Sequence, residues 1–155
     1  MKPVEFQTTW GTITLTLDGT GKALAMDLPH LNKKPTAEFS VMKPKPTSAV
    51  FFRQIEKKFG PVKIPEGTEF QRAVWREMKK ILRGQTRTYS EIAAAIGRPK
   101  AVRAVGSACG ANPLPVFIPC HRVVAKNGLG GFGSGLPWKK LLLRLESWSN
   151  GALES

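Results

Sequence analysis

The residues best suited to chemistry lie at positions 119–122, where the sequence reads Pro-Cys-His-Arg. Apolar residues precede and follow them, which predicts a thiol on a proline-fixed bend within a buried, strand-like stretch. A buried cysteine is ordinarily an inert, small hydrophobic residue. Beside His121 and Arg122, however, a thiolate at Cys120 could be stabilised by positive charge and hydrogen bonding, as in reactive cysteines. From these residues alone, both interpretations of Cys120 stay open.

Three short helices are expected to precede this segment. Thr68 can cap the first, which ends before Gly84. Its apolar residues keep i, i+4 spacing and are Phe70, Val74, Met78 and Leu82. Residues 88–97 predict a second helix closed by glycine, and residues 98–100 turn the chain into a third helix over 101–109. This order is typical of a helix-turn-helix motif, although many helical pairs in proteins that bind no DNA look the same.

The predicted third helix carries almost no bulky side chain. Val102, Val105 and Cys109 are expected on one apolar face, with alanines 101, 104 and 108 in a stripe beside it. Arg103 and Ser107 project away from the core. Such a smooth surface either permits tight helix packing or lets the backbone approach a narrow groove of nucleic acid. The helix pattern does not choose between the two.

The charge balance favours a polyanionic partner. The chain has 155 residues, 24 Lys and Arg against 11 Asp and Glu, a net charge of +13 and a pI of about 10.2. Nucleic acid is the first candidate, although structural basic proteins share this property. The chain has no apolar run of membrane-spanning length and a polar start without a secretion signal, so we expect an intracellular, cytoplasmic protein that does not bind membranes.

The cysteine and histidine counts limit metal chemistry. Two cysteines are too few for a disulfide scaffold and are more consistent with reduced thiols, either of which could be a nucleophile. The two histidines lie far apart, and no Cys-x-x-Cys pair occurs. We therefore expect no structural metal and no cofactor.

An α+β fold in two domains is expected. Residues 4–27 read as two or three strands of an antiparallel sheet with a turn at 18–21, residues 28–48 as a loop and residues 48–59 as a helix. A connector rich in proline and glycine follows at 60–67. We therefore predict a small N-terminal α+β domain over 1–65. The mainly helical domain over 66–155 would contain the helix-turn-helix and the Pro-Cys-His-Arg active-site strand.

The sequence Ile-Pro-Cys-His-Arg-Val-Val at 118–124 resembles the signature of the O6-alkylguanine-DNA alkyltransferases, also called methylated-DNA–protein-cysteine methyltransferases. The resemblance covers residues 67–147, more than half of the chain. It extends, in family order and spacing, through residues 67–75, 88–93, 103–106, 112–113 and 139–146. The resemblance identifies the chain as a member of this family.

The resemblance implies a set of catalytic residues. Cys120 matches the family's alkyl acceptor, and His121 matches the histidine that activates the thiol through a water held with the help of a glutamate, here Glu146. A base that takes the thiol proton and a carboxylate that orients the base form a triad. A glutamate near the end of its helix is electrostatically unfavourable, which also favours a functional role for Glu146. Tyr89 is expected to donate to the departing purine, and Asn112 matches the family's hinge asparagine.

The resemblance also implies minor-groove binding and base flipping. Arg103 matches the arginine finger that fills the gap left by the flipped nucleotide. Ala104, Gly106, Ser107 and Ala108 would form the small groove-facing surface of the same helix. The implied partner is double-stranded DNA that contains O6-alkylguanine, bound by a monomer.

The implied substrate pocket departs from the common pattern. Its expected residues are Pro119, Val123, Phe132, Gly133 and Ser134. Many members have a tyrosine where this chain has Phe132, so which of Phe132, Gly133 and Ser134 meets the O6 atom is open. Residues 1–65 carry no zinc ligands and are expected to shield the active-site domain and help it fold.

The resemblance implies an irreversible, single-turnover transfer of the alkyl group to Cys120, because a thioether offers water no leaving group. Such a protein works in the cytoplasm on the nucleoid of a prokaryote, or in a eukaryotic nucleus. Two alternatives remain: an alkyltransferase-like protein that binds damage without repair, and a helix-turn-helix regulator. Cys120 argues against the first, because that sister group has another residue there.

Overall fold

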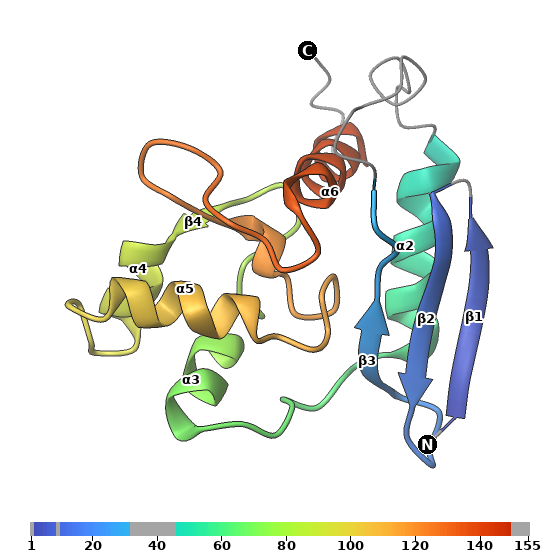
Figure 1. Ribbon diagram of the computed structural model, residues 1–155, viewed down its shortest axis with the longest axis horizontal. Helices are drawn as coiled ribbons and strands as arrows, with labels where there is room; N and C mark the ends of the chain where they lie inside the picture. Colours follow the sequence, from blue (N-terminus) through green and yellow to red (C-terminus); the bar gives the residue numbers. More distant parts are fainter. Residues whose placement is uncertain (1, 9, 32–45, 150–155) are drawn as a thin grey trace.

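The N-terminal part of the chain forms an antiparallel sheet of three strands, β1 (Lys2–Thr8), β2 (Gly11–Leu17) and β3 (Ala23–Asp27), in the order β1-β2-β3 (Figure 1). The computed structural model describes residues 2–8, 10–31 and 46–149. In β2 the side chains of alternate residues 13, 15 and 17 are buried, as a sheet with one covered face requires. The loop expected at 28–48 falls largely outside the described residues, because residues 32–45 are among those left out.

Helix α2 (Pro46–Phe59) lies against this sheet in Figure 1. Aromatic rings fill the space between them. Phe6 of β1 packs edge-on against Phe59 with ring centroids 6.0 Å apart, and Trp10 stacks on Phe52 at 5.7 Å. The predicted strands and this helix are therefore present, and a hydrophobic core of aromatic residues joins them.

Helices α3 (Glu69–Met78) and α4 (Tyr89–Ala95) each begin at a threonine cap. Thr68 accepts a hydrogen bond from the backbone of Gln71, whose side chain accepts one from the Thr68 backbone, and Thr88 makes the same box with Glu91. Two otherwise unpaired donors are satisfied at each helix start. The cap predicted at Thr68 is confirmed. The prediction that Leu82 continues the apolar face of this helix is wrong. The helix ends at Met78, and Leu82 is 64% exposed.

Helix α5 (Val102–Gly110) follows α4 after a turn in which Gly97 has a φ of +76°, so the helix-turn-helix arrangement is present. The expected faces of α5 need two corrections. Val102 is 36% exposed and not on the buried face. Ala108 is only 2% exposed, because that side of the helix packs on α3, and its carbonyl accepts a hydrogen bond from Trp75 Nε1 at 2.9 Å.

The Pro-Cys-His-Arg segment enters strand β5 (Val123–Val124) through one 3-10 turn, η1 (Cys120–Arg122). Strand β5 pairs in parallel with β4 (Arg87–Thr88), which joins the segment to the start of α4. Helix α6 (Leu136–Ser149) lies between the helical part and α2 (Figure 1). The predicted α+β class, with a small antiparallel sheet and a mostly helical remainder, is confirmed. Across the described residues, every helix is too short or too polar to cross a membrane.

Candidate active site

A pocket of about 460 Å³ opens between α5, η1 and the loop before α6. Its wall includes side chains predicted for two different roles, DNA contact and base recognition. The lining residues are Tyr89, Arg103, Gly106, Ser107, Cys109, Gly110, Cys120, Gly131, Phe132 and Gly133. The helix expected to face DNA therefore also forms one wall of the pocket that holds the thiol.

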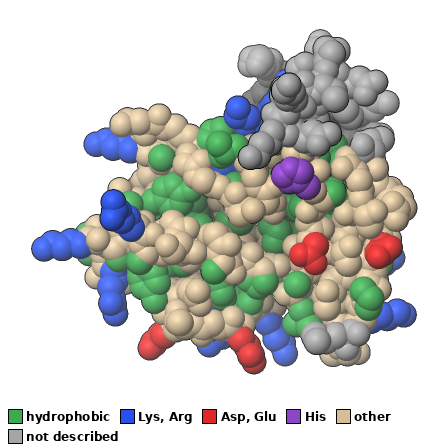
Figure 2. Space-filling view, in the orientation of Figure 1, with side chains coloured by type: hydrophobic (Ala, Val, Ile, Leu, Met, Phe, Trp, Pro, Cys, Tyr) green, Lys and Arg blue, Asp and Glu red, His purple; other side chains and the backbone are tan. Residues whose placement is uncertain are grey.

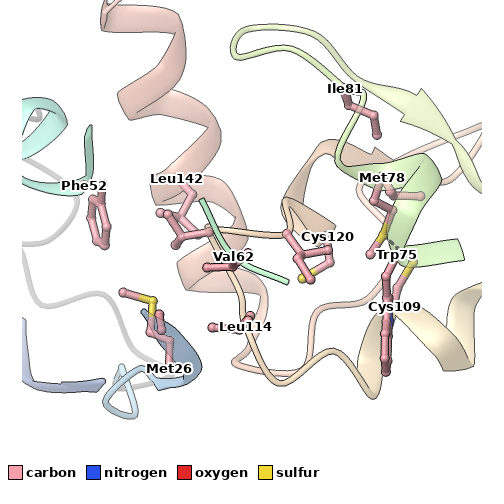
Figure 3. Close-up of a cluster of buried hydrophobic side chains, with 14 of the residues drawn as sticks. Met26, Phe52, Val62, Trp75, Met78, Ile81, Cys109, Leu114, Cys120 and Leu142 are labelled. Carbon is pink, nitrogen blue, oxygen red and sulfur yellow. Dashed lines mark hydrogen bonds between the residues drawn. The ribbon is translucent and has the colours of Figure 1, made fainter. Parts of the chain in front are cut away.

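Cys120 lies in the wall of this pocket, 6% exposed, within the continuous cluster of buried side chains that Figure 3 shows. Burial raises the pKa of its thiol to about 11, and a hydrogen bond from Asn112 acts in the opposite direction. Asn112 Nδ2 lies 3.3 Å from Cys120 Sγ and also donates to the carbonyl of Ile118 at 2.8 Å. The resting thiol is protonated, and an amide donor already points at the sulfur.

Cys109 lines the same pocket from α5, but its surroundings are different. Its Sγ lies 3.5 Å from the sulfur of Met78, and burial raises its pKa to about 12. The sulfur contact gives a thiolate no stabilisation comparable with an amide donor. Of the two thiols, Cys120 has the environment of a nucleophile.

His121 is fully buried next to Cys120 and contacts Glu146 of α6. Its Nε2 lies 2.6 Å from Glu146 Oε1. Burial alone would raise the pKa of Glu146, but hydrogen bonds from His121 and Arg122 lower it to about 2. Because this carboxylate can only accept, Nε2 carries the shared proton. Nδ1 is buried and has no hydrogen-bond partner among the described residues, so its lone pair is left to act as a base.

The protonation state of His121 follows from its neighbours. Burial lowers its pKa, Glu146 acts to raise it, and the charges of Arg122 and Lys139 lower it again. The net direction is downward, so the imidazole is neutral at neutral pH. A neutral imidazole with one free nitrogen is the form that can accept a proton from a thiol.

Lys139 of α6 was not assigned a role from its position in the sequence, yet it is a central residue of the site. Its side chain is fully buried, and Nζ donates to the carbonyls of Val123 at 2.6 Å and Gly131 at 2.9 Å. It also lies 3.4 Å from the hydroxyl of Tyr89, which donates to the Gly131 carbonyl. Lys139 thus connects β5, the pocket loop and Tyr89.

The pocket loop fits closely around Tyr89. Gly130 has a φ of +74°, and a Cβ there would come within 2.6 Å of the Tyr89 ring. Only glycine allows both this backbone conformation and this approach. The ring of Tyr89 is therefore fixed between α4 and the loop, with its hydroxyl at the pocket.

The structure brings most of the predicted site residues together. Cys120, Tyr89, Arg103, Gly106, Ser107, Phe132 and Gly133 all line the pocket. Asn112 donates to the thiol of Cys120, and His121, the next residue along the chain, pairs with Glu146. Ala104 is exposed on α5.

Four predicted residues lie elsewhere. The side chains of Pro119 and Val123 are buried, and Val123 contributes its carbonyl to Lys139 instead. Ser134 is not among the lining residues, and Ala108 is in the core. The sequence analysis assigned no site role to Lys139 or Gly131 and left Cys109 open as a nucleophile. It expected the charge of Arg122 beside the thiol, whereas Arg122 pairs with Glu146. Buried charges at positions 122 and 139 carry no periodic signal, although an Arg beside a Cys-His pair already pointed to local charge. Within the described residues, no group of three or more His, Cys, Asp or Glu side chains is placed to hold a metal ion.

The chain is similar to known methylated-DNA–protein-cysteine methyltransferases. Methylated-DNA–protein-cysteine methyltransferase of Methanosarcina acetivorans is 55% identical over 91 residues, which cover 58% of each chain. The probable enzyme of that name from Acanthamoeba polyphaga mimivirus is 59% identical over 81 residues, 52% of this chain and 54% of that one. The chain therefore spans about half the length of the curated relatives it matches.

The fold has a solved counterpart over nearly its whole length. The crystal structure of Mycobacterium tuberculosis OGT in complex with DNA superposes with a TM-score of 0.70 and 31% identity, covering 94% of this chain and 93% of that one. Residues 69–148 match the sequence model of the DNA binding domain of 6-O-methylguanine DNA methyltransferase. That match spans all four residues of the thiol network, Asn112, Cys120, His121 and Glu146. The chain belongs to the 6-O-methylguanine DNA methyltransferase family.

Proposed function

We propose that this protein repairs DNA by moving the alkyl group of O6-alkylguanine onto Cys120 in a single, irreversible turnover. The observation that carries the proposal is a pocket-lining thiol at Cys120 that already accepts a hydrogen bond from Asn112 and adjoins the His121–Glu146 pair. The family and the relatives' names support the same reaction. A protein that only bound the damage would have no use for this thiol environment.

The thiol loses its proton to His121. Because the protonated Nε2 donates a hydrogen bond to Glu146, Nδ1 is the basic nitrogen, and it takes the thiol proton through a bridging water. The pKa of about 11 means that a free thiolate is scarce at rest, so deprotonation accompanies the reaction. Asn112 then stabilises the sulfur anion, and the protonated imidazole is stabilised by Glu146. The thiolate attacks the alkyl carbon, a sulfur–carbon bond forms and the bond to O6 breaks.

The guanine leaves with a proton from Tyr89. The Tyr89 hydroxyl lies at the pocket wall, 3.4 Å from Lys139 Nζ, so the lysine ammonium compensates the charge that develops on the tyrosine oxygen. Protons balance: one leaves the thiol for His121 and one leaves Tyr89 for the purine. The thioether has no leaving group for water, so Cys120 is consumed.

The partner is double-stranded DNA that carries the lesion. The O6 atom cannot reach a buried thiol inside a duplex, so the base must rotate out. The exposed side of α5, with Ala104 and Gly106, is smooth enough to enter the minor groove while Arg103 fills the stack. Lys and Arg side chains stand out along the left edge of Figure 2, over α4 and α5, and the net charge of +13 favours phosphate contacts.

We also propose a division near residue 65, with the N-terminal part as a shield and folding partner. Hydrogen bonds join it to the active-site half. Met26 N donates to the Pro113 carbonyl at 2.9 Å, and Trp138 Nε1 donates to the Pro29 carbonyl at 2.7 Å. Lys79 Nζ donates to the Val62 carbonyl at 2.9 Å, and Arg83 pairs with Glu56 at 3.0 Å. The protein would act as a monomer where the DNA is, in the cytoplasm of a prokaryote or the nucleus of a eukaryote.

The proposal is tested by incubating the protein with duplex DNA that contains radiolabelled O6-methylguanine. We expect one label per protein and a mass increase of one methylene on the peptide that contains Cys120. Cys120→Ala should abolish transfer and still bind the damaged duplex, because affinity comes from phosphate and groove contacts. Cys109→Ala is the matched control and should transfer normally. Label on Cys109, or binding without any transfer by the parent, would contradict the proposal.

A further inference from the structure

Arg122 directly follows the Cys-His pair, and its guanidinium makes hydrogen bonds from all three of its nitrogens. It is 7% exposed. Its Nε lies 3.0 Å from both carboxylate oxygens of Glu146, and its Nη2 lies 2.6 Å from Oε1. Its Nη1 donates to the carbonyl of Ile81 at 2.8 Å. The guanidinium and His121 thus share one carboxylate, on which Oε1 receives hydrogen bonds from both.

We propose that Arg122 is a positioning residue that keeps His121 neutral, so that Nδ1 remains free to take the thiol proton. The inference rests on the alkyl transfer proposed above and concerns how its base is maintained. Arg122 touches neither the thiol nor the pocket in the described structure, and it acts through Glu146.

The reason is the charge balance of a buried cluster. A carboxylate buried beside a histidine alone stabilises the imidazolium, because an unpaired buried charge is costly and a proton on the imidazole would neutralise the pair. With Arg122 in place, Glu146 is already compensated, and a second positive charge on His121 gains little. The bidentate geometry also fixes the carboxylate plane, which orients the imidazole.

Within the described residues, the charged and titratable groups around His121 come from three elements. Helix α6 contributes Glu146 and Lys139, and η1 contributes Arg122 and the thiol of Cys120. From α2, Glu56 lies close enough to interact with Arg122 and Glu146 and is itself paired with Arg83 at 3.0 Å. Among these, Arg122 is the positive group in direct contact with the carboxylate that His121 uses.

A purely structural role is the competing explanation, because Arg122 also ties η1 to the segment after α3 through Ile81. The two roles differ in their dependence on pH. Loss of a scaffold contact slows transfer equally at every pH. Loss of the compensating charge raises the pKa of His121, so the base becomes protonated and transfer is lost preferentially at low pH.

The experiment uses the full chain and the free base O6-benzylguanine, which requires no DNA. Single-turnover rate constants are measured between about pH 5.5 and about pH 8.5, on either side of the ordinary histidine pKa. The rate constant of the parent should change little across this pH range. Arg122→Met should lose about tenfold in rate per pH unit on its acidic limb and recover toward high pH. Arg122→Lys, which keeps the charge, should restore the flat profile even if its rate is lower.

The control is Arg87→Met, which removes an arginine that pairs with Glu77 away from the pocket and should leave rate and profile unchanged. A parallel loss by Arg122→Met at every pH, or identical profiles for the Met and Lys variants, would overturn the proposal.

Nitrogen NMR of the His121 ring provides a readout that needs neither transfer nor a folded Arg122→Met variant. The parent should show a neutral ring with the proton on Nε2 at about pH 6, below the ordinary histidine pKa. In a folded Arg122→Met variant, the His121 ring should carry a proton on both nitrogens at this pH. A doubly protonated His121 in the parent at neutral pH would overturn the inference. If the parent instead shows the expected tautomer but transfers no benzyl group, the proposed function fails and the inference about Arg122 survives.

Discussion

Helix α6 contributes to two buried clusters, one of aromatic side chains and one of charged and polar side chains. The aromatic cluster comprises Phe6, Trp10, Phe51, Phe52, Phe59 and Trp138. The polar cluster comprises His121, Arg122, Lys139 and Glu146. Trp138 and Lys139 are adjacent in sequence, yet one packs against Trp10 at 5.7 Å while the other donates to the backbone of Val123.

The difference shows what each cluster contributes. Aromatic rings gain stability simply by leaving water, and several edge-to-face pairs add to it. Buried charges cost desolvation free energy that their ion pairs and hydrogen bonds only partly offset. A fold needs the first kind of cluster, whereas the second has a use in the reaction proposed above. The two clusters should therefore respond differently to substitution.

The largest expected loss of stability follows from Phe52→Ala in the aromatic cluster. Phe52 is buried against Trp10 and Trp138, so its removal leaves a cavity and should cost about 3–5 kcal/mol of unfolding free energy. The rate of benzyl transfer per folded molecule should stay close to that of the parent. Urea unfolding and single-turnover kinetics measure the two. Phe51→Ala, at a partly buried position, is the matched control and should lose less.

A smaller loss of stability and a larger loss of activity are expected from Lys139→Met. The methionine fills similar volume but leaves the carbonyls of Val123 and Gly131 without this donor, which should cost about 1–3 kcal/mol. Because Tyr89 and the pocket loop lose their common anchor, transfer should slow on the order of 100-fold. Lys140→Met, at the exposed neighbouring position, should match the parent in both measurements. A normal rate in the Lys139 variant would mean that the polar cluster is only structural.

The smallest effect on stability is expected from Ala104→Glu, outside both clusters. Ala104 is exposed on α5, and glutamate costs only a few tenths of a kcal/mol there. If α5 enters the groove, the added bulk and negative charge should weaken duplex binding while the reaction with free O6-benzylguanine is kept.

The control for this variant is Gly19→Glu in the hairpin of the sheet, where a Cβ meets nothing within 4 Å. It adds the same charge and should bind duplex DNA like the parent in titrations at fixed salt. Undiminished binding by Ala104→Glu would remove α5 from the interface, and a substantial drop in its melting temperature would place Ala104 in the core.

Local chemistry in the sequence was enough to predict the strands of the antiparallel sheet, helices α2, α4 and α5, and the start of α3. The threonine at position 68 starts a helix because its hydroxyl satisfies a backbone donor three residues later, and the alternation over 12–17 produces a half-buried strand. The Pro-Cys-His-Arg tetrapeptide predicts a candidate nucleophile, because a thiol between a proline bend and a histidine followed by an arginine is unusual in a core. Each of these signals depends on residues within a few positions of one another.

Only the tertiary structure decided which distant side chains meet. Leu82 and Ala108 follow the expected helical spacing, yet one is exposed and the other is buried, because the end of α3 and the packing of α5 on α3 determine their environments. Arg122 reaches a carboxylate 24 residues away, and Lys139 reaches a tyrosine 50 residues away. A buried charge is tolerated only where the folded chain supplies its partners, and nothing in the local pattern around Arg122 or Lys139 specifies those partners.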